Sequence, residues 1–331
     1  MAAPNPETVR KVLVTGAGGF VGTRLCHALA QHGRSVVAIT RRAVDPALKA
    51  ALRVERLSLL SEPEKWLSAM RSSDSVVHLA ARAHEARSRG EEAEFERTNV
   101  EGSRFVAELA AQVGVRRFIF LSSIKVNGEG RDGFYRTEDM PDPRDPYGRS
   151  KLAAEQGIRE VCASNQMELV IIRPPLVFGP GVRANFRKLI WLADLGIPLP
   201  FGLVENQRSL IGLHNLVDFI ETCIDHPAAP GRVWLIADEE LLSTAELLRR
   251  LSRHLNRSGR LLDVSPAWLR AMSRLVGQGG TISRLCDSLR IDSSEARTLL
   301  DWRPKYSIDD ELARTVEAYR NEQSMRLPPI T

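Results

Sequence analysis

Short apolar runs alternate along this chain with longer stretches in which apolar residues recur every three or four positions. The runs are rich in β-branched residues and fall at Val12–Val14, Val36–Ile39, Ser75–Leu79, Phe118–Leu121 and Leu169–Ile172. Helical patterns between them cover Thr23–His32, Asn99–Val113 and Tyr147–Ser164. Strands that are apolar on both faces and separated by helices predict a parallel sheet covered on each side. The expected fold class is therefore α/β, with a doubly wound sheet.

The pattern changes after Arg173. Prolines and glycines break the chain into short pieces, and helical patterns return only near Ser243–Leu255 and Ile308–Asn321. We therefore expect a sheet domain over residues 1–175 and a smaller, mainly ligand-binding domain over residues 176–331, with some of this later chain returning to the first domain. The smaller domain should pack near the carboxyl ends of the strands, where α/β sheets bind ligands.

Composition and charge exclude several classes of protein. The chain has 331 residues and a net charge of +5, and its basic residues are scattered without aromatic interleaving, so no nucleic-acid partner is expected. It has no apolar run of the roughly 18 residues that a membrane span needs and no signal peptide, which predicts a cytoplasmic protein with no membrane partner. The four cysteines are far apart, as free thiols are, and no metal site is expected. His78 is interpreted as a satisfied, partly buried histidine.

A glycine-rich turn joins the first strand to the first helix. Residues 15–22 read TGAGGFVG, with glycines at 16, 19 and 22 in the spacing G-x-x-G-x-x-G. Such a turn lets the backbone approach a pyrophosphate, which the N-terminus of the following helix stabilises. The sequence therefore predicts a dinucleotide site that includes Gly16, Gly19, Phe20, Val21 and Gly22.

The end of the second strand bears on the choice of dinucleotide. A carboxylate at this point usually accepts hydrogen bonds from the adenine ribose of NAD. Here the strand ends in Thr40-Arg41-Arg42, with no acid before Asp45. Two guanidiniums suit the ribose 2′-phosphate of NADP through charge-assisted contacts, unless they are simply solvated surface arginines. The sequence favours NADP(H) held by Thr40, Arg41 and Arg42, and NAD(H) is the alternative.

Tyr147 and Lys151 form the candidate catalytic pair. They are four residues apart, so on a helix they share one face, and Asp145-Pro146 just before them suits a helix start. A free tyrosine has a pKa near ~10, and a neighbouring ammonium together with an oxidised nicotinamide would lower it. Ser123 follows the strand before this helix, which would place its hydroxyl in the active crevice. Asn99 lies at the start of another helix.

At this point the chain resembles the extended short-chain dehydrogenase/reductases, and within them the NAD-dependent epimerase/dehydratase family, whose members have a Rossmann fold and act on nucleotide sugars. The resemblance covers nearly the whole chain. It is carried by TGAGGFVG (15–22), VVHLAA (76–81), TNVEGS (98–103), FLSSIKVNG (120–128), YGRSK (147–151), RPPLVFGPG (173–181), RSLIGLHNLVD (208–218) and LDWRP (300–304).

The resemblance implies a role for each matching residue. Tyr147 would be the general acid/base, Lys151 would hold the nicotinamide ribose and tune Tyr147, Ser123 would bond the reacting sugar oxygen, and Asn99 would support the wall of the site. Further cofactor contacts are implied at Leu79, Ala80, Ala81 and Pro174. Substrate contacts are implied at Ser122, Ser123, Lys125, Asn185 and Arg208, although Lys125 is also interpreted as an ordinary solvated lysine. Leu176 departs from the family, many of whose members have an asparagine there.

Three reactions share this scaffold. Dehydratases of the family have an Asp-Glu pair directly after the catalytic hydroxyl, where this chain has Ile124 and Lys125, so dehydration is not expected. Because the second strand favours NADPH, and because SSIKVNGE (122–129) is similar to known reductases, C4 reduction of a UDP-4-keto-6-deoxy-HexNAc for surface polysaccharide synthesis ranks slightly above 4-epimerisation of a UDP-sugar with retained NAD.

Two further expectations complete this interpretation. A dinucleotide-binding sensor without catalysis is the alternative of another class, but such proteins typically lack Ser123 or the Tyr147–Lys151 pair. A homodimer formed through the helices at Asn99–Val113 and Tyr147–Ser164 is implied by the resemblance alone.

Overall fold

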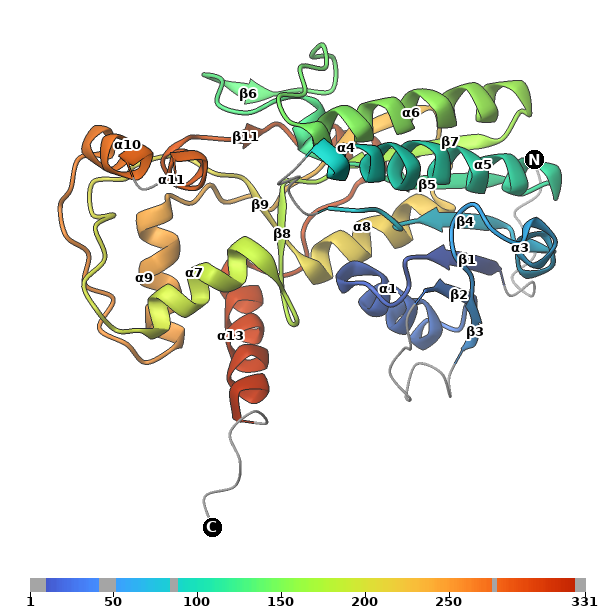
Figure 1. Ribbon diagram of the computed structural model, residues 1–331. Helices are drawn as coiled ribbons and strands as arrows, with labels where there is room; N and C mark the ends of the chain where they lie inside the picture. The colour runs from blue at the N-terminus through green and yellow to red at the C-terminus, as the bar shows by residue number, and fades with distance from the viewer. Residues whose placement is uncertain (1–9, 42–51, 84–88, 276–278, 325–331) are drawn as a thin grey trace.

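The protein is represented by a computed structural model that describes residues 10–41, 52–83, 89–275 and 279–324. Within these residues, seven strands form a central sheet in the order β10-β7-β5-β4-β1-β2-β3 (Figure 1). Each neighbouring pair is parallel. The strands are β1 (Lys11–Thr15), β2 (Ser35–Thr40), β3 (Arg53–Arg56), β4 (Ser75–His78), β5 (Arg117–Leu121), β7 (Glu168–Arg173) and β10 (Arg232–Leu235).

Helices cover both faces of this sheet because successive strand residues point to opposite sides. Val12 and Val14 of β1 pack in a core with α1 (Phe20–Gln31), α8 (Leu213–Asp225) and α12 (Ser294–Leu300). Leu13, between them, packs in the opposite core with α3 (Pro63–Met70), α5 (Gly102–Gln112) and α6 (Pro146–Ser164). Two helical layers thus enclose a parallel sheet, and the predicted doubly wound fold class is confirmed.

A second region lies on the side toward which the strand arrows point in Figure 1. Its core is separate and includes Phe178, Phe186 and Leu248. The small sheets pair β8 (Leu176–Phe178) with β9 (Leu210–Gly212), and β6 (Phe134–Tyr135) with β11 (Arg290–Ile291). The helices are α7 (Ala184–Asp194), α9 (Thr244–His254), α10 (Pro266–Leu275), α11 (Gly279–Cys286) and α13 (Ile308–Ser324). This arrangement places the second region at the carboxyl ends of the strands, where the predicted site residues gather.

The five strands expected from the sequence are β1, β2, β4, β5 and β7, so these predictions are confirmed. Strands β3 and β10, at the two edges of the sheet, were not predicted. The helix expected from Asn99 begins earlier, as α4 (Arg89–Phe95) followed by a π-helical segment, η1 (Glu96–Glu101), which runs into α5. Within the described residues, every helix is too short or too polar to span a bilayer.

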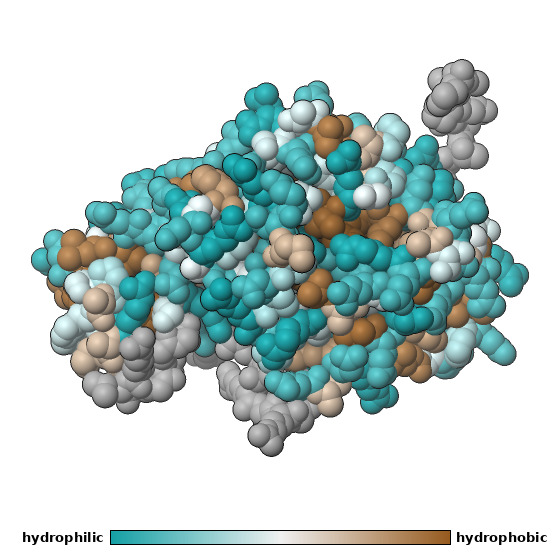
Figure 2. Space-filling model, turned by 90° about the horizontal axis from the view of Figure 1, so that it is seen from above, coloured by the Kyte–Doolittle hydropathy of each residue, from teal (hydrophilic) through white to brown (hydrophobic). Residues whose placement is uncertain are grey.

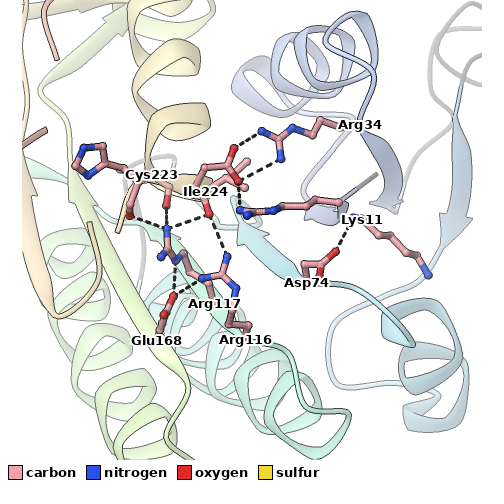
Figure 3. A network of polar contacts seen from close by, with 11 residues as sticks. Lys11, Arg34, Asp74, Arg116, Arg117, Glu168, Cys223 and Ile224 are labelled. Atoms are coloured by element: carbon pink, nitrogen blue, oxygen red, sulfur yellow. Dashed lines mark hydrogen bonds and ion pairs between the residues drawn. The ribbon is translucent and has the colours of Figure 1, made fainter. Parts of the chain in front are cut away.

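Arg117 is the first residue of β5 and joins the amino end of this strand to the end of α8 (Figure 3). Its side chain is buried, and Nη1 donates to the carbonyls of Cys223, Ile224 and His226 at 2.7, 2.9 and 3.0 Å. Its Nε donates to Glu168 of β7 at 2.6 Å. The last carbonyls of a helix lack intrahelical partners, so the guanidinium satisfies the end of α8 and fixes it on the sheet.

Candidate active site

The turn between β1 and α1 is built for close approach of a ligand's phosphates. Gly16 has φ +68°, and a Cβ there would lie 2.8 Å from the backbone nitrogen of Ala80. A Cβ at Gly22 would lie 2.2 Å from the carbonyl oxygen of Gly16, so α1 packs directly on the turn. Gly19 is the N-cap of α1 and has no side chain to cap the helix. The backbone N–H groups of the first turn of α1 can therefore donate to a phosphate. These residues therefore fit the pyrophosphate of a dinucleotide.

The segment after β4 forms the neighbouring wall of this turn. Thr15 Oγ1 accepts hydrogen bonds from the backbone nitrogens of Leu79 and Ala80, both at 3.2 Å, and contacts His78 Nδ1 at 2.8 Å. His78 Nε2 contacts Ser103 Oγ at 3.0 Å, and burial lowers the pKa of His78 to about 3, so the ring is neutral. Leu79, Ala80 and the following Ala81 are half-buried, which leaves part of each accessible to a ligand. In the described residues, no cluster of His, Cys, Asp or Glu is suited to a metal ion.

The end of β2 holds the residues predicted to select the cofactor. Thr40 is buried and its carbonyl accepts from Leu57 N at 3.1 Å, whereas Arg41 is exposed. Arg42 lies outside the described residues. The preference for NADP therefore stays a prediction here.

Tyr147 and Ser123 are brought together as predicted, by two adjoining elements. Asp145 begins α6, and its Oδ1 accepts from Gly148 N at 2.6 Å, which fixes the first turn that carries Tyr147. Ser123 has extended backbone at the end of β5 and precedes a short 3₁₀ helix, η2 (Ile124–Val126). The Ser123 hydroxyl lies close enough to the Tyr147 phenol to act on its pKa. A phenol and an alcohol thus share one position at the carboxyl end of β5.

The chain itself does not lower the pKa of Tyr147 as the sequence suggested. Burial raises that pKa to about 12, the Asp145 charge adds to the increase, and the Ser123 hydroxyl opposes it. The physical reason is that a phenolate in this site loses solvation and faces a carboxylate. The oxidised nicotinamide, which the sequence predicts beside the lysine, is a positive charge that would oppose this increase.

Lys151 lies one helical turn after Tyr147 on α6 and is buried. Its Nζ donates to the carbonyl of Leu121 at 2.7 Å and lies 3.9 Å from the centroid of the Phe120 ring. Burial lowers the pKa of Lys151 to about 7, and the nearby Glu155 carboxylate opposes that decrease. The ammonium is thus anchored at the end of β5, beside the strand residues that precede Ser123.

Asn99 lies in the π-helical segment η1 and is fully buried. Its Oδ1 accepts from Arg82 N at 2.8 Å, while its Nδ2 donates to Arg82 O at 3.1 Å and to Ser150 Oγ at 2.9 Å. One amide therefore links the segment after β4 to α6. This contact pattern suits the predicted role of supporting the wall of the site.

Ser122 points away from this group. Its hydroxyl donates to Glu155 at 2.5 Å, and Glu155 also receives two hydrogen bonds from the buried Arg173, at 2.9 and 2.6 Å. A substrate contact by the Ser122 side chain would have to compete with this carboxylate. Pro174, which follows β7, accepts from Ile124 N at 3.0 Å and so fixes the start of η2.

The remaining predicted substrate residues lie in different surroundings. Asn185 is exposed near the start of α7. Arg208 is largely buried, and its Nη1 donates to the carbonyls of Arg284 and Asp287, the latter at 2.9 Å; burial lowers its pKa. Lys125 forms ion pairs with Asp145 and with Glu129, the latter at 3.5 Å. Sequence reasoning missed the roles of Glu155 and Arg173; the spacing of Glu155 four residues after Lys151 was the available signal.

Comparisons with known proteins agree with this geometry. Residues 12–237 match the NAD dependent epimerase/dehydratase family. A Vibrio cholerae protein named UDP-glucose 4-epimerase is 39% identical over 328 residues, which cover 96% of this chain and 98% of that relative. An Escherichia coli O157:H7 4-epimerase of N-acetyl-alpha-D-glucosaminyl-diphospho-ditrans,octacis-undecaprenol is 30% identical over 74% of this chain and 72% of its own length.

Solved structures show the same architecture over almost the full chain. MoeE5 in complex with UDP-glucuronic acid and NAD aligns with a TM-score of 0.77 and 26% identity, covering 94% of this chain and 99% of MoeE5. The UDP-glucose 4-epimerase of Thermotoga maritima aligns with a TM-score of 0.77 and 22% identity, covering 95% of this chain and 99% of that protein's chain. This likeness supports the fold alone. The chain therefore belongs to the NAD-dependent epimerase/dehydratase family and is an enzyme of the short-chain dehydrogenase/reductase type.

Proposed function

We propose that this enzyme is a UDP-sugar 4-epimerase that retains NAD. The observation that carries the proposal is the approach of the Ser123 hydroxyl to the Tyr147 phenol at the carboxyl end of β5, which only β4 separates from β1 and the glycine turn that fits a dinucleotide. The named activity of the Vibrio cholerae relative, which matches this chain nearly end to end, supports epimerisation. Epimerisation thus moves ahead of C4 reduction, which ranked slightly higher on the sequence alone.

The proposed chemistry assigns a task to each residue of the site. NAD, held by the glycine turn and the segment after β4, would supply the hydride acceptor and donor. Tyr147 takes the proton of the sugar 4-hydroxyl and later returns it, and Ser123 hydrogen-bonds the same oxygen while charge develops on it. Lys151 and Asn99 hold the geometry of this group. Asn185 and Arg208 are proposed to contact the diphosphate end of the substrate.

Dehydration has little support from the residues after Ser123. Ile124 is buried and apolar, so it cannot act as an acid. Lys125, at the next position, is paired with Asp145 and Glu129. Elimination of water across C5–C6 of the sugar needs an acid and a base, and at these two positions the chain has an apolar side chain and a lysine held in ion pairs.

C4 reduction of a UDP-4-keto-6-deoxy sugar is the second candidate. It is favoured by the end of β2, where exposed Arg41 follows Thr40 in place of the acid that suits NAD. If NADP(H) is the cofactor, Arg41→Ala weakens its binding by about tenfold or more while NAD(H) binding changes little. Calorimetric titration with both dinucleotides measures this, and equal effects on the two would argue against NADP selection.

The decisive experiment measures the reaction itself. Purified protein is incubated with UDP-glucose or UDP-GlcNAc, and the 4-epimers are separated by chromatography; in parallel, NADPH oxidation is followed with a UDP-4-keto-6-deoxy sugar. We expect epimers to form, and Tyr147→Phe to reduce turnover by about 10²- to 10⁴-fold while dinucleotide still binds. NADPH oxidation without epimer formation would replace the epimerase by the reductase.

A further inference from the structure

We propose that Lys125 is a positioning residue for Tyr147: its ammonium balances the charge of Asp145 and ties the first turn of α6 to the segment that carries Ser123. This inference rests on the proposed function, because it concerns how the site holds its acid/base. It also assigns a different task to Lys125 from the substrate contact that the sequence suggested.

The first support is that Lys125 lies between two carboxylates from different segments. Its Nζ pairs with Asp145 Oδ2 at the start of α6, and with Glu129 Oε1 at 3.5 Å in the loop after η2. The Lys125 and Asp145 side chains are 23% and 26% exposed, so solvent screens this pair less than an ordinary surface pair.

The second support is that Asp145 has two tasks and Lys125 occupies only one of its oxygens. Asp145 Oδ1 caps α6 through Gly148 N at 2.6 Å, while Oδ2 faces Lys125. A free carboxylate at a helix start can turn to solvent, whereas one held from both sides keeps its cap. The ion pair therefore fixes the turn from which Tyr147 projects.

The backbone of Lys125 contacts the same turn. A Cβ at Gly148 would lie 2.7 Å from the carbonyl oxygen of Lys125, so η2 and α6 meet with no room for a side chain. The backbone nitrogen of Lys125 donates to Ser123 Oγ at 3.3 Å. Lys125 thus contacts the alcohol on one side and the helix carrying the phenol on the other.

The third support is electrostatic. Asp145 raises the pKa of Tyr147, so an unbalanced Asp145 would hold the phenol protonated to still higher pH. The groups that act on the Tyr147 phenol are the Asp145 carboxylate, at the N-cap of α6, and the Ser123 hydroxyl. Behind Asp145 lie Lys125 of η2, which pairs with it, and Glu129, which pairs with Lys125. Among them, Lys125 is the cation paired with Asp145.

The test compares four variants of the NAD-loaded enzyme: Lys125→Met, Asp145→Asn, the double variant and Lys125→Arg. Asparagine caps helices about as well as aspartate, so Asp145→Asn removes the charge and keeps the cap. Lys65→Met is the matched control, because Lys65 pairs with Glu62 on the distant helix α3. The pH dependence of kcat and KM is measured for each.

We expect Lys125→Met to move the acid limb of kcat up by about one pH unit, which lowers kcat at neutral pH about tenfold with KM little changed. Adding Asp145→Asn to Lys125→Met should return the acid limb of kcat to its wild-type pH. Lys125→Arg and Lys65→Met should both keep the acid limb at the wild-type pH. An increase in KM that the second substitution does not reverse, with an unmoved acid limb, would make Lys125 a substrate contact and overturn the proposal.

A measurement without sugar separates this inference from the proposed function. The chain has four tyrosines, so the tyrosinate absorbance of Tyr147 in the NAD-loaded protein is obtained by subtracting the Tyr147→Phe variant. We expect the pKa of Tyr147 measured in this way to rise in Lys125→Met and to return in the double variant. This result is expected even if none of the tested sugars is epimerised. An unshifted titration would overturn the role of Lys125, whatever the substrate proves to be.

Discussion

Lys151 combines full burial with a positive charge and only weak compensation. Its Nζ has a carbonyl partner, Leu121, and the face of Phe120, while the Glu155 carboxylate acts from farther along α6. Desolvation penalises the ammonium more than these groups stabilise it, which lowers the pKa of Lys151 to about 7. Protonation of one side chain near neutral pH therefore becomes coupled to the stability of the fold.

This coupling predicts how stability depends on pH. Between about pH 7 and the unfolded pKa near ~10.4, the unfolded chain holds a proton on Lys151 that the folded chain has released, so stability rises with pH. Below about pH 7 both states are protonated and this contribution is absent. We expect urea unfolding of the protein without cofactor to show this. Above pH ~7, the free energy of unfolding of the wild type should rise with pH more steeply than that of Lys151→Met, by up to about 1.4 kcal/mol per pH unit. Parallel curves for the two proteins would refute the assigned pKa.

At the scale of single residues, the candidate site was predictable where chemistry follows local spacing. Tyr147 and Lys151 share a helix face because they are four residues apart, and Ser123 follows a recognisable strand. Two ion pairs could not be predicted in this way: Glu155 with Arg173, and Lys125 with Asp145. Each joins segments that meet only in the folded chain. The high pKa of Tyr147 has the same origin, since burial and facing charges are properties of packing.

At the scale of elements, α1 shows how a missing side chain sets a packing distance. Gly22 lies against the carbonyl of Gly16, where a Cβ would come within 2.2 Å, and against Ala17 Cα at 2.8 Å. Both contacts are with backbone atoms, which cannot move aside as a flexible side chain can. The helix is therefore held at the distance that points its N-terminus at the turn.

Gly22→Ala should push α1 away from the turn. We expect a loss of about 1–3 kcal/mol in the free energy of unfolding and weaker binding of NAD, by about tenfold or more, because the phosphate-facing N–H groups move with the helix. Gly157→Ala on α6 is the control, since its Cβ would meet only the Arg104 side chain, with Cδ at 3.9 Å and Cβ at 4.0 Å. Denaturation and calorimetric titration measure both effects; unchanged NAD affinity in Gly22→Ala would contradict the close-packing argument.

The end of α8 provides a second prediction at this scale. Arg117→Met would leave the carbonyls of Cys223, Ile224 and His226 without their buried donor. We expect the free energy of unfolding to fall by about 2–4 kcal/mol, because the Cys223 carbonyl loses its donor and those of Ile224 and His226 keep only the longer bonds from Arg116 Nη2, at 3.4 Å, and Ala229 N, at 3.2 Å. Arg53→Met, which breaks an exposed pair with Glu55 on β3, should change it by less than about 0.5 kcal/mol. Similar losses in the two variants would deny Arg117 this special role.

The two strands of the central sheet that the sequence did not predict lie at its edges. Strand β3 reads Arg-Val-Glu-Arg and is partly exposed, so it lacks the apolar run by which buried strands are recognised. Strand β10 is four residues long and comes after the proline-rich part of the chain. Both are stabilised by pairing with β2 and β7, which is information about neighbours in space rather than in sequence.

At the scale of the whole molecule, the chain crosses between its two regions more than once. After β7 it enters the second region, returns as α8 and β10 to the sheet, and leaves again for α9, α10 and α11. The chain leaves the central sheet for the second region at the carboxyl ends of β7 and β10. This threading ties the proposed substrate contacts, Asn185 and Arg208, to the sheet through covalent chain on both sides.

The outer layer formed by α5 and α6 is the face on which we expect two copies of the chain to associate. Arg104 of α5 pairs with Glu160 of α6 at 3.3 Å, which joins the two helices into one layer. Figure 2 views the molecule from this side and shows hydrophobic residues among hydrophilic ones. In a two-fold interface every residue is used twice, so one unfavourable substitution is also made twice.

Light scattering should therefore give a mass twice the 36.8 kDa of one chain. Ala153→Arg, at a partly exposed position of α6, should shift the population toward the monomer at low concentration because it places two like charges in one interface. Lys188→Glu on the exposed surface of α7 is the control and should leave the mass unchanged. A wild-type mass of one chain at all concentrations would exclude this association. Loss of the dimer in both variants would instead place the interface elsewhere on the molecule.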